Sequence, residues 1–362
     1  MRFFSYILLV TIGVLIPIEC TAPSQISASY IFQAPTKTLR IAAVGDILLG
    51  LNYPDSLIRT TPDDGASLLN LHSSIIRKAN LSLGNLEGVL LDKGNATKSI
   101  QNATVKYLFR MPERYAFRLK KAGFDFMSLA NNHTRDFGID GLRSTMRSLS
   151  NENIHYAGIK GICESVIIKK DNIRYGVCAF APYAATVSIL DYGYSTKIIS
   201  ELKKKCDIVI VSMHTGAEGI DQVHVPHSME IFHGELRGDA HRFAHLAIDS
   251  GADLVLGHGP HVVRAMELYK DRLIAYSLGN YCTPFGVSKV GKCGYAPLLE
   301  IFINNSGEFL YGKIHSAIQK GSNGPVEDSD NLVIDEIRKL SQEDYPNSEL
   351  KIDKGGRIYR GA

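Results

Sequence analysis

The chain has 362 residues, of which 45% are hydrophobic and 21% charged, so it can bury a sizeable core in one large domain or two smaller ones. Its formal net charge of +3 is too small to indicate a nucleic-acid partner. The longest basic run, Lys203 to Lys205, suits the C-terminal end of a helix. We therefore expect a globular protein that binds no nucleic acid.

The chain opens with a positive charge and an apolar run from Phe3 to Ile18. This run is slightly long for the apolar part of a signal peptide and slightly short for a spanning helix, which needs about 20 apolar residues. We expect residues 1–22 to be a signal peptide or a membrane anchor, and residues 23–37 to be a linker. The protein is thus predicted to be exported, either anchored or secreted, at the extracytoplasmic face of the membrane or in the periplasm.

From Thr38 onward, strand-like runs alternate with helical patterns, which is typical of a layered α/β fold. Pro112 marks the expected start of one helix, Lys120 lies in its last turn, and Gly123 follows its end. Two further helices are expected at 140–149 and 241–250.

The sequence changes character after Gly321, where one amphipathic helix is expected near residues 331–341. We therefore predict one domain over residues 38–320 and a short C-terminal extension with one helix over residues 321–362.

Five of the six cysteines lie beyond the N-terminal segment, and this odd number excludes full pairing. No Cys-x-x-Cys spacing indicates a metal site. Cys282 and Cys293 flank a glycine-containing loop, so the sequence leaves open a bridge between them or five free thiols.

Several apolar, strand-like runs end in Asp, Glu, Asn or His, although a hydrophobic core needs none of these residues. In open α/β sheets, ligands bind beyond the carboxyl ends of the strands. The pattern therefore predicts one active-site rim built from distant parts of the chain. The runs are 41–44 before Asp46, 81–83 before Asn85 and Glu87, 124–130 before Asn132 and His133, 208–213 before His214, 254–256 before His258 and His261, and 273–278 before Asn280.

Taken singly, most of these residues have a structural explanation, such as a turn for Asp46 or a helix cap for Asn132. His258 and His261 are harder to explain by packing, because two imidazoles flank a Gly-Pro turn directly after a buried strand. Neutral imidazole is a common ligand for zinc, manganese and iron, so a metal or phosphate site is predicted. A looser group of histidines is interpreted as surface residues: His224, His227 and His233.

These motifs resemble those of the CapA (PgsA-like) capsule-synthesis proteins, whose domain is similar to the calcineurin-like metallophosphatases. The resemblance spans roughly residues 38–320 and implies a four-layer αββα sandwich. It is carried by 44–47 (VGDI), 84–88 (GNLEG), 130–138 (ANNHTRDFG), 214–219 (HTGAEG), 234–239 (GELRGD), 249–262 (DSGADLVLGHGPHV) and 276–281 (YSLGNY).

The resemblance also implies the role of each site residue. One or two divalent ions (manganese, zinc or iron) would clamp a phosphoryl group and activate a water. Glu87 would bridge two metals, and His133 would protonate a leaving group or steady a phosphoryl oxygen, with Asp136 as the second catalytic candidate. The implied metal ligands are Asp46, Glu87, Asn132, His214, His258 and His261. The candidates for binding substrate or orienting ligands are Asn85, Arg135, Glu235, Arg237 and Asn280.

Two departures from the metallophosphatase pattern leave the activity open. Leu48 stands where the first motif has a histidine, and two residues rather than one separate His258 from His261. One interpretation is a metal-dependent hydrolase or transferase that acts on a phosphate ester or on an amide of an anionic polymer. The other is a non-catalytic subunit that binds polymer or membrane-bound capsule and polyglutamate synthase subunits. A protein with a decayed site is a third alternative.

Overall fold

The computed structural model describes residue 1 and residues 38–56, 58–97 and 107–361. The expected signal or anchor segment and the linker lie outside this part of the chain, apart from Met1. Among the described residues, no helix has both the length and the apolar character needed to cross a membrane. The described residues from Thr38 onward form one unit.

The first large sheet has nine strands, with β1 near its middle. Strand β1 runs parallel to β2 and β15 and antiparallel to β16, so the sheet is mixed. Its strands, in spatial order, are β20 (Leu350–Ile352), β21 (Arg357–Arg360), β17 (Phe309–His315), β16 (Leu298–Ile303), β1 (Leu39–Ile47), β2 (Leu81–Leu86), β5 (Phe126–Ser128) and β6 (His155–Ala157), with β15 (Asn280–Cys282) paired to β1.

The second large sheet has six strands, of which the four central ones are parallel. Their order is β13 (Met266–Tyr269), β14 (Arg272–Ala275), β12 (Leu254–His258), β9 (Ile208–His214), β8 (Ile173–Phe180) and β7 (Ser165–Lys170). Three two-stranded sheets complete the strands: β3 (Val89–Leu90) with β4 (Arg110–Met111), β10 (Glu230–Phe232) with β11 (Glu235–Gly238), and β18 (Ala317–Gln319) with β19 (Pro325–Glu327).

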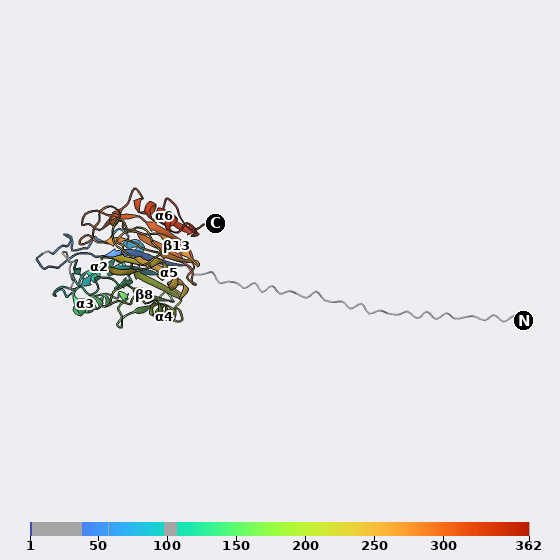
Figure 1. Ribbon diagram of the computed structural model, residues 1–362, viewed down its shortest axis with the longest axis horizontal. Coiled ribbons are helices and arrows are strands. Elements are labelled where there is room, and N and C mark those ends of the chain that lie inside the picture. Colours follow the sequence, from blue (N-terminus) through green and yellow to red (C-terminus); the bar gives the residue numbers. More distant parts are fainter. Residues whose placement is uncertain (2–37, 57, 98–106, 362) are drawn as a thin grey trace. The chain divides into compact units, whose positions relative to one another are not determined.

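The alternation of side chains along β1 shows how the layers stack. Ile41 and Ala43 belong to the core between the two large sheets, whereas Val44 packs with helices on the outer face. Ile47 joins Val44 on that face because the strand register shifts between Asp46 and Ile47. Those helices are α1 (Ser73–Lys78), α2 (Tyr115–Ala122) and α3 (Gly138–Asn151). The outer face of the six-stranded sheet packs against α4 (Tyr192–Lys203) and α5 (Ala240–Asp249). The expected four-layer αββα sandwich is therefore confirmed (Figure 1).

The expected helices are present, with small differences at their ends. Helix α2 stops at Gly123, whose φ of 108° suits glycine, but it begins at Tyr115 rather than Pro112. The residues from Pro112 form a turn in which the Tyr115 amide donates to the Pro112 carbonyl at 3.0 Å. The helices expected at 140–149 and 241–250 correspond to α3 and α5.

The C-terminal segment contains more than the expected single helix. Helix α6 (Leu332–Asp344) lies where it was expected, near the C-terminal end in Figure 1, but β20 and β21 follow and extend the nine-stranded sheet. Val333 and Ile337 of α6 are fully buried in the core between the large sheets. The C-terminal segment is therefore part of the four-layer sandwich.

All five cysteines of this part of the chain carry free thiols: Cys163, Cys178, Cys206, Cys282 and Cys293. The bridge between Cys282 and Cys293, which the sequence left open, is not formed.

Candidate metal centre

The carboxyl ends of strands from both large sheets bring the predicted residues together. In the nine-stranded sheet, the strand register places Asp46 of β1 opposite Asn85 of β2 and Asn280 of β15. In the six-stranded sheet, His214 of β9 lies opposite His258 of β12. Residues up to 234 positions apart in sequence therefore share one rim, because the chain repeatedly returns to the same edge.

The Gly-Pro turn after β12 depends on a glycine. Gly259 has a φ of 112°, and a Cβ there would lie 3.0 Å from the backbone nitrogen and oxygen of Thr215. The positive φ and the close approach of this turn to the end of β9 both favour glycine at this position. His261 itself has a φ of 58°, a conformation that non-glycine residues rarely adopt.

Three residues form the centre of the site: Asp46, Glu87 and His261. One ligand atom from each lies within 4.8 Å of the other two. His261 Nδ1 is 3.2 Å from Asp46 Oδ2, and His261 Nε2 is 3.6 Å from Glu87 Oε1. Both carboxylates are fully buried, and neither Glu87 oxygen has a hydrogen-bond partner in the described part of the chain.

The electrostatics of this group follow from burial and mutual charge. Burial raises the pKa of Glu87 well above its usual value, and the charge of Asp46 adds to the effect. Burial also acts to raise the pKa of Asp46, but hydrogen bonding to His261 and its charge outweigh this and lower that pKa to about 2. For His261, burial acts to lower the pKa, but Glu87 and Asp46 together raise it well above 6.5.

Two further histidines stand beside this group as neutral imidazoles. Burial lowers the pKa of His214 well below its usual value and also lowers that of His258. In the described part of the chain, His214 Nε2 is buried without a hydrogen-bond partner, whereas His258 Nε2 lies 3.2 Å from the Val44 carbonyl oxygen. A neutral ring with an unused buried nitrogen is the form that binds a metal.

His133 and Asp136 form a buried pair. His133 Nδ1 is 2.7 Å from Asp136 Oδ2, and the ring stacks on Phe109 with centroids 3.9 Å apart. The same Asp136 oxygen accepts a hydrogen bond from the Phe109 amide at 2.8 Å, so both the carboxylate and the ring are fixed in orientation.

A cleft of about 630 Å³ opens onto these residues. Asn132, His133 and His261 line it, together with Arg237 and Glu218, whose side chains form an ion pair at 2.7 Å. Arg237 is buried and also donates a hydrogen bond to the Tyr183 hydroxyl. The cleft is thus lined both by candidate metal ligands and by the ion pair of Arg237 with Glu218.

The remaining predicted residues differ in how they relate to the cleft. Glu235 is exposed and lies 3.5 Å from Arg237, and exposed Arg135 lines a neighbouring pocket that also includes Asn132 and Tyr183. Asn85 and Asn280 are fully buried beside the ligands. Asn85 donates to Asp46 Oδ1 at 2.8 Å, and the Asn280 amide oxygen is 2.9 Å from His261 Nδ1. These two amides hold the ligands in place.

Sequence reasoning assigned no role to Glu218, Tyr183 or Phe109. Glu218 lay within a recognised motif just after β9, so the strand-end pattern could have identified it. Tyr183 similarly follows β8. For Phe109, which precedes β4, the sequence gives no comparable signal.

The residues present fit a divalent metal ion. Two buried carboxylates, of which one has no hydrogen-bond partner among the described residues, surround an imidazole, and a second imidazole has an unused buried nitrogen. Burial of such charges is costly unless a cation or hydrogen bonds compensate it. A mixed carboxylate and imidazole set suits manganese, iron or zinc.

Comparison with known proteins gives two kinds of match. A family model described as "Bacterial capsule synthesis protein PGA_cap" matches residues 40–284. The chain is 27% identical to the capsule biosynthesis protein CapA of Bacillus anthracis, over 80% of this chain and 69% of that protein. It is 26% identical to the PGA biosynthesis protein CapA of Bacillus subtilis (strain 168), over 88% of this chain and 81% of that protein.

Among solved structures, a 5'-nucleotidase precursor from Thermus thermophilus superposes with a TM-score of 0.43 and 14% identity. The match covers 85% of this chain and 59% of that chain. So weak a superposition supports no functional conclusion.

Proposed function

The chain belongs to the bacterial capsule synthesis protein family PGA_cap, and we propose that it serves capsule or poly-γ-glutamate biosynthesis as a metal-dependent hydrolase. Its substrate would be a phosphate ester or an amide of an anionic polymer, bound in the cleft beside Asp46, Glu87 and His261.

The proposal rests on the buried carboxylate of Glu87. Its carboxylate is fully buried, flanked by Asp46 and His261, and has no hydrogen-bond partner in the described part of the chain. A carboxylate buried in this way is expected to have a cation as its partner. Asp46, Glu87 and His261 would hold the metal, with His214 as a further ligand, and a bound metal supplies a Lewis acid and an activated water.

The protein's own residues would position the substrate and move the proton. With Nδ1 held by Asp136, the His133 ring presents Nε2 as the atom that delivers a proton to the leaving group. Arg237 would orient an anionic substrate, while its ion pair with Glu218 keeps the guanidinium in place.

One observation favours a second candidate, a non-catalytic subunit that binds polymer or partner proteins. Leu48 is fully buried in an apolar cluster at the position where metallophosphatases carry an additional imidazole. One metal position would therefore lack a ligand, and a singly occupied cleft could bind carboxylates without hydrolysing anything.

Replacement of His133 by Asn separates these two functions. We expect the untagged variant to keep the metal content of the wild type, because Asp46, Glu87 and His261 are intact, but to lose about 10²–10⁴-fold in kcat as a general acid is removed. The measurements are elemental analysis and turnover of a chromogenic phosphodiester and of poly-γ-glutamate. His233→Asn is the matched control, because His233 lines the same cleft but is exposed.

Two results would contradict the proposed hydrolase activity. One is a His133→Asn variant that is as active as the wild type and the control. The other is a metal-loaded wild type that turns over neither substrate, which together with polymer binding would favour the second candidate.

We extend the proposal to location: an exported protein that acts with membrane-bound synthase subunits outside the cytoplasm. The apolar run from Phe3 to Ile18 after a positive start and the family membership support it. Recovery of the full chain in the cytosolic fraction of its host would contradict it.

A further inference from the structure

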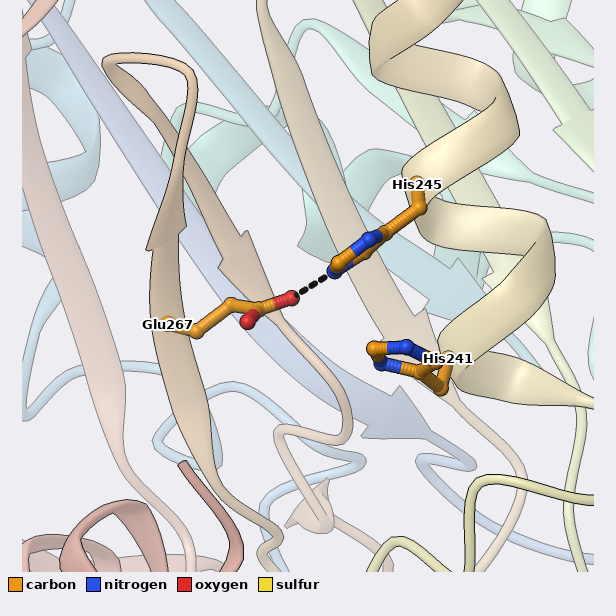
Figure 2. Close-up of side chains that lie close together, drawn as sticks. All are labelled: His241, His245 and Glu267. Carbon is orange, nitrogen blue, oxygen red and sulfur yellow. Dashed lines mark hydrogen bonds and ion pairs between the residues drawn. The ribbon is translucent and has the colours of Figure 1, made fainter. Parts of the chain in front are cut away.

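A second group of metal-binding side chains lies on other elements of the fold. His241 and His245 are four residues apart on α5, so they share one face of that helix. Glu267 reaches them from β13, the edge strand of the six-stranded sheet. Figure 2 shows both rings and the carboxylate directed toward one another, and one ligand atom from each lies within 4.8 Å of the others.

Neighbouring aromatic residues hold these side chains in position. His245 Nε2 is 2.5 Å from Glu267 Oε1, and the Tyr276 hydroxyl donates to the same oxygen at 2.6 Å. His241 Nδ1 lies 3.2 Å from the Tyr345 hydroxyl. His227, which is exposed as expected, stacks on the His241 ring with centroids 4.0 Å apart and planes within 3°. Metal-binding side chains are typically oriented by such outer contacts.

The charge of Glu267 is weakly compensated. Its side chain is only 7% exposed, and across the described ranges its one ion-pair partner is His245, with no lysine or arginine. A carboxylate buried to this extent favours a permanent cation nearby. Both histidines are partly exposed, so water can reach the group and complete the coordination of an ion.

This group is separate from the centre at the strand ends. The two share no residue, and Glu267 lies on a strand that contributes nothing to the cleft. Ligand binding at this group is therefore independent of the proposed hydrolase.

We propose that His241, His245 and Glu267 form a structural site for a transition-metal dication of the zinc type, with water as a further ligand. Two imidazoles and one carboxylate are a common protein ligand set for zinc. An ion bound there connects α5 to β13, and so ties the outer helical layer to the edge of the six-stranded sheet.

The test uses the untagged full chain carrying Glu87→Gln, which disables the centre at the strand ends. We expect this protein to bind about one equivalent of zinc and, with Co²⁺ in its place, to show the visible absorption of a low-coordinate site. Addition of His241→Gln and His245→Gln is expected to weaken binding by more than about 100-fold, because two of three protein ligands are lost. His155→Gln, which alters an exposed histidine on β6, is the matched control and should bind like its parent.

A second pair of variants tests the geometry even if the double variant fails to fold. Glu267→Gln removes the charge but keeps an oxygen that can accept from Tyr276, and it is expected to abolish the Co²⁺ spectrum with an unchanged far-UV spectrum. Tyr276→Phe removes only the orienting hydroxyl and should weaken binding by about 10-fold. If Glu267→Gln binds as tightly as its parent, or if the parent binds no zinc, His245 and Glu267 form an ion pair and nothing more, and the proposal is overturned.

Discussion

Buried ionisable residues are expected to make the stability of this protein depend on pH, and one of them lies outside the cleft. His72, at the N-terminal end of α1, is 6% exposed and lies 3.4 Å from the Tyr281 hydroxyl. Burial, and secondarily the neighbouring His315, lowers the pKa of His72 from 6.5 to about 4. Its ring therefore stays neutral in the folded protein at pH values where it is protonated in the unfolded chain.

The pKa of His72 predicts a loss of stability in acid. Between pH 6.5 and about 4 the unfolded state binds one proton more than the folded state, so stability falls as pH falls through this window. The difference is worth up to about 3 kcal/mol. Urea denaturation at pH 7 and pH 4.5 should show a smaller loss in His72→Gln than in the wild type.

His233→Gln serves as the control for this experiment, because it replaces an exposed histidine and should lose stability as the wild type does. An acid-induced loss that is identical in all three proteins would show that His72 is not responsible.

At the same scale, the strand-end pattern predicted one shared rim, and one ligand atom each from Asp46, Glu87 and His261 lies within 4.8 Å of the other two. Their chemical roles stay predictions. Asn85 and Asn280 were expected at this rim, but their contacts with Asp46 and His261 could not be foreseen, because they depend on the register that sets Asp46 opposite both. A sequence shows which residues end a strand but not which residue of the neighbouring strand faces them.

At the scale of elements, the close approach of β1 to the segment before β15 is what lets the rim form. The Asp46 amide donates to the Gly279 carbonyl at 2.9 Å, and a Cβ on Gly45 would lie only 1.9 Å from that oxygen. A side chain at Gly45 would therefore push the two segments apart. The helices were easier to foresee, because caps such as Gly123 are local signals, whereas this packing is not.

Gly45→Ala is predicted to lower the free energy of unfolding by about 1–3 kcal/mol, because the added methyl group overpacks two backbone segments. The displaced Asp46 should also weaken metal binding, which titration calorimetry can measure. The matched control is Gly193→Ala on α4, where a Cβ meets only Asp191 Oδ1, at 3.8 Å. That change should be neutral or stabilising by up to about 1 kcal/mol, and equal effects of the two substitutions would refute the argument.

At the scale of the whole molecule, the C-terminal segment completes the sandwich. The sequence indicated a single helix there, because short strands such as β20 and β21 have too few residues to show a period. The structure places both in the nine-stranded sheet and buries Ile358 and Ile337 in the core between the sheets. The four layers themselves were expected only through the family resemblance, since periodicity alone indicated α/β layering without their number.

Ile337→Ala on α6 tests whether this segment folds with the rest. We expect it to destabilise the protein by about 2–5 kcal/mol, with one cooperative transition, because it opens a cavity in the shared core. Lys339→Ala, an exposed change on the same helix, should stay within about 0.5 kcal/mol of the wild type. A separate early transition confined to α6 would instead show that the segment unfolds alone.

The division of the candidate ligands between the two large sheets has a consequence for folding. Asp46 lies near the end of β1 and Glu87 directly follows β2 in one sheet, while His214 and His258 end strands of the other. An ion in the cleft is then held only while the two sheets keep their mutual alignment. Its release should precede the loss of strands when the protein is unfolded gradually, so a coloured ion such as Co²⁺ would report the first slippage between the sheets.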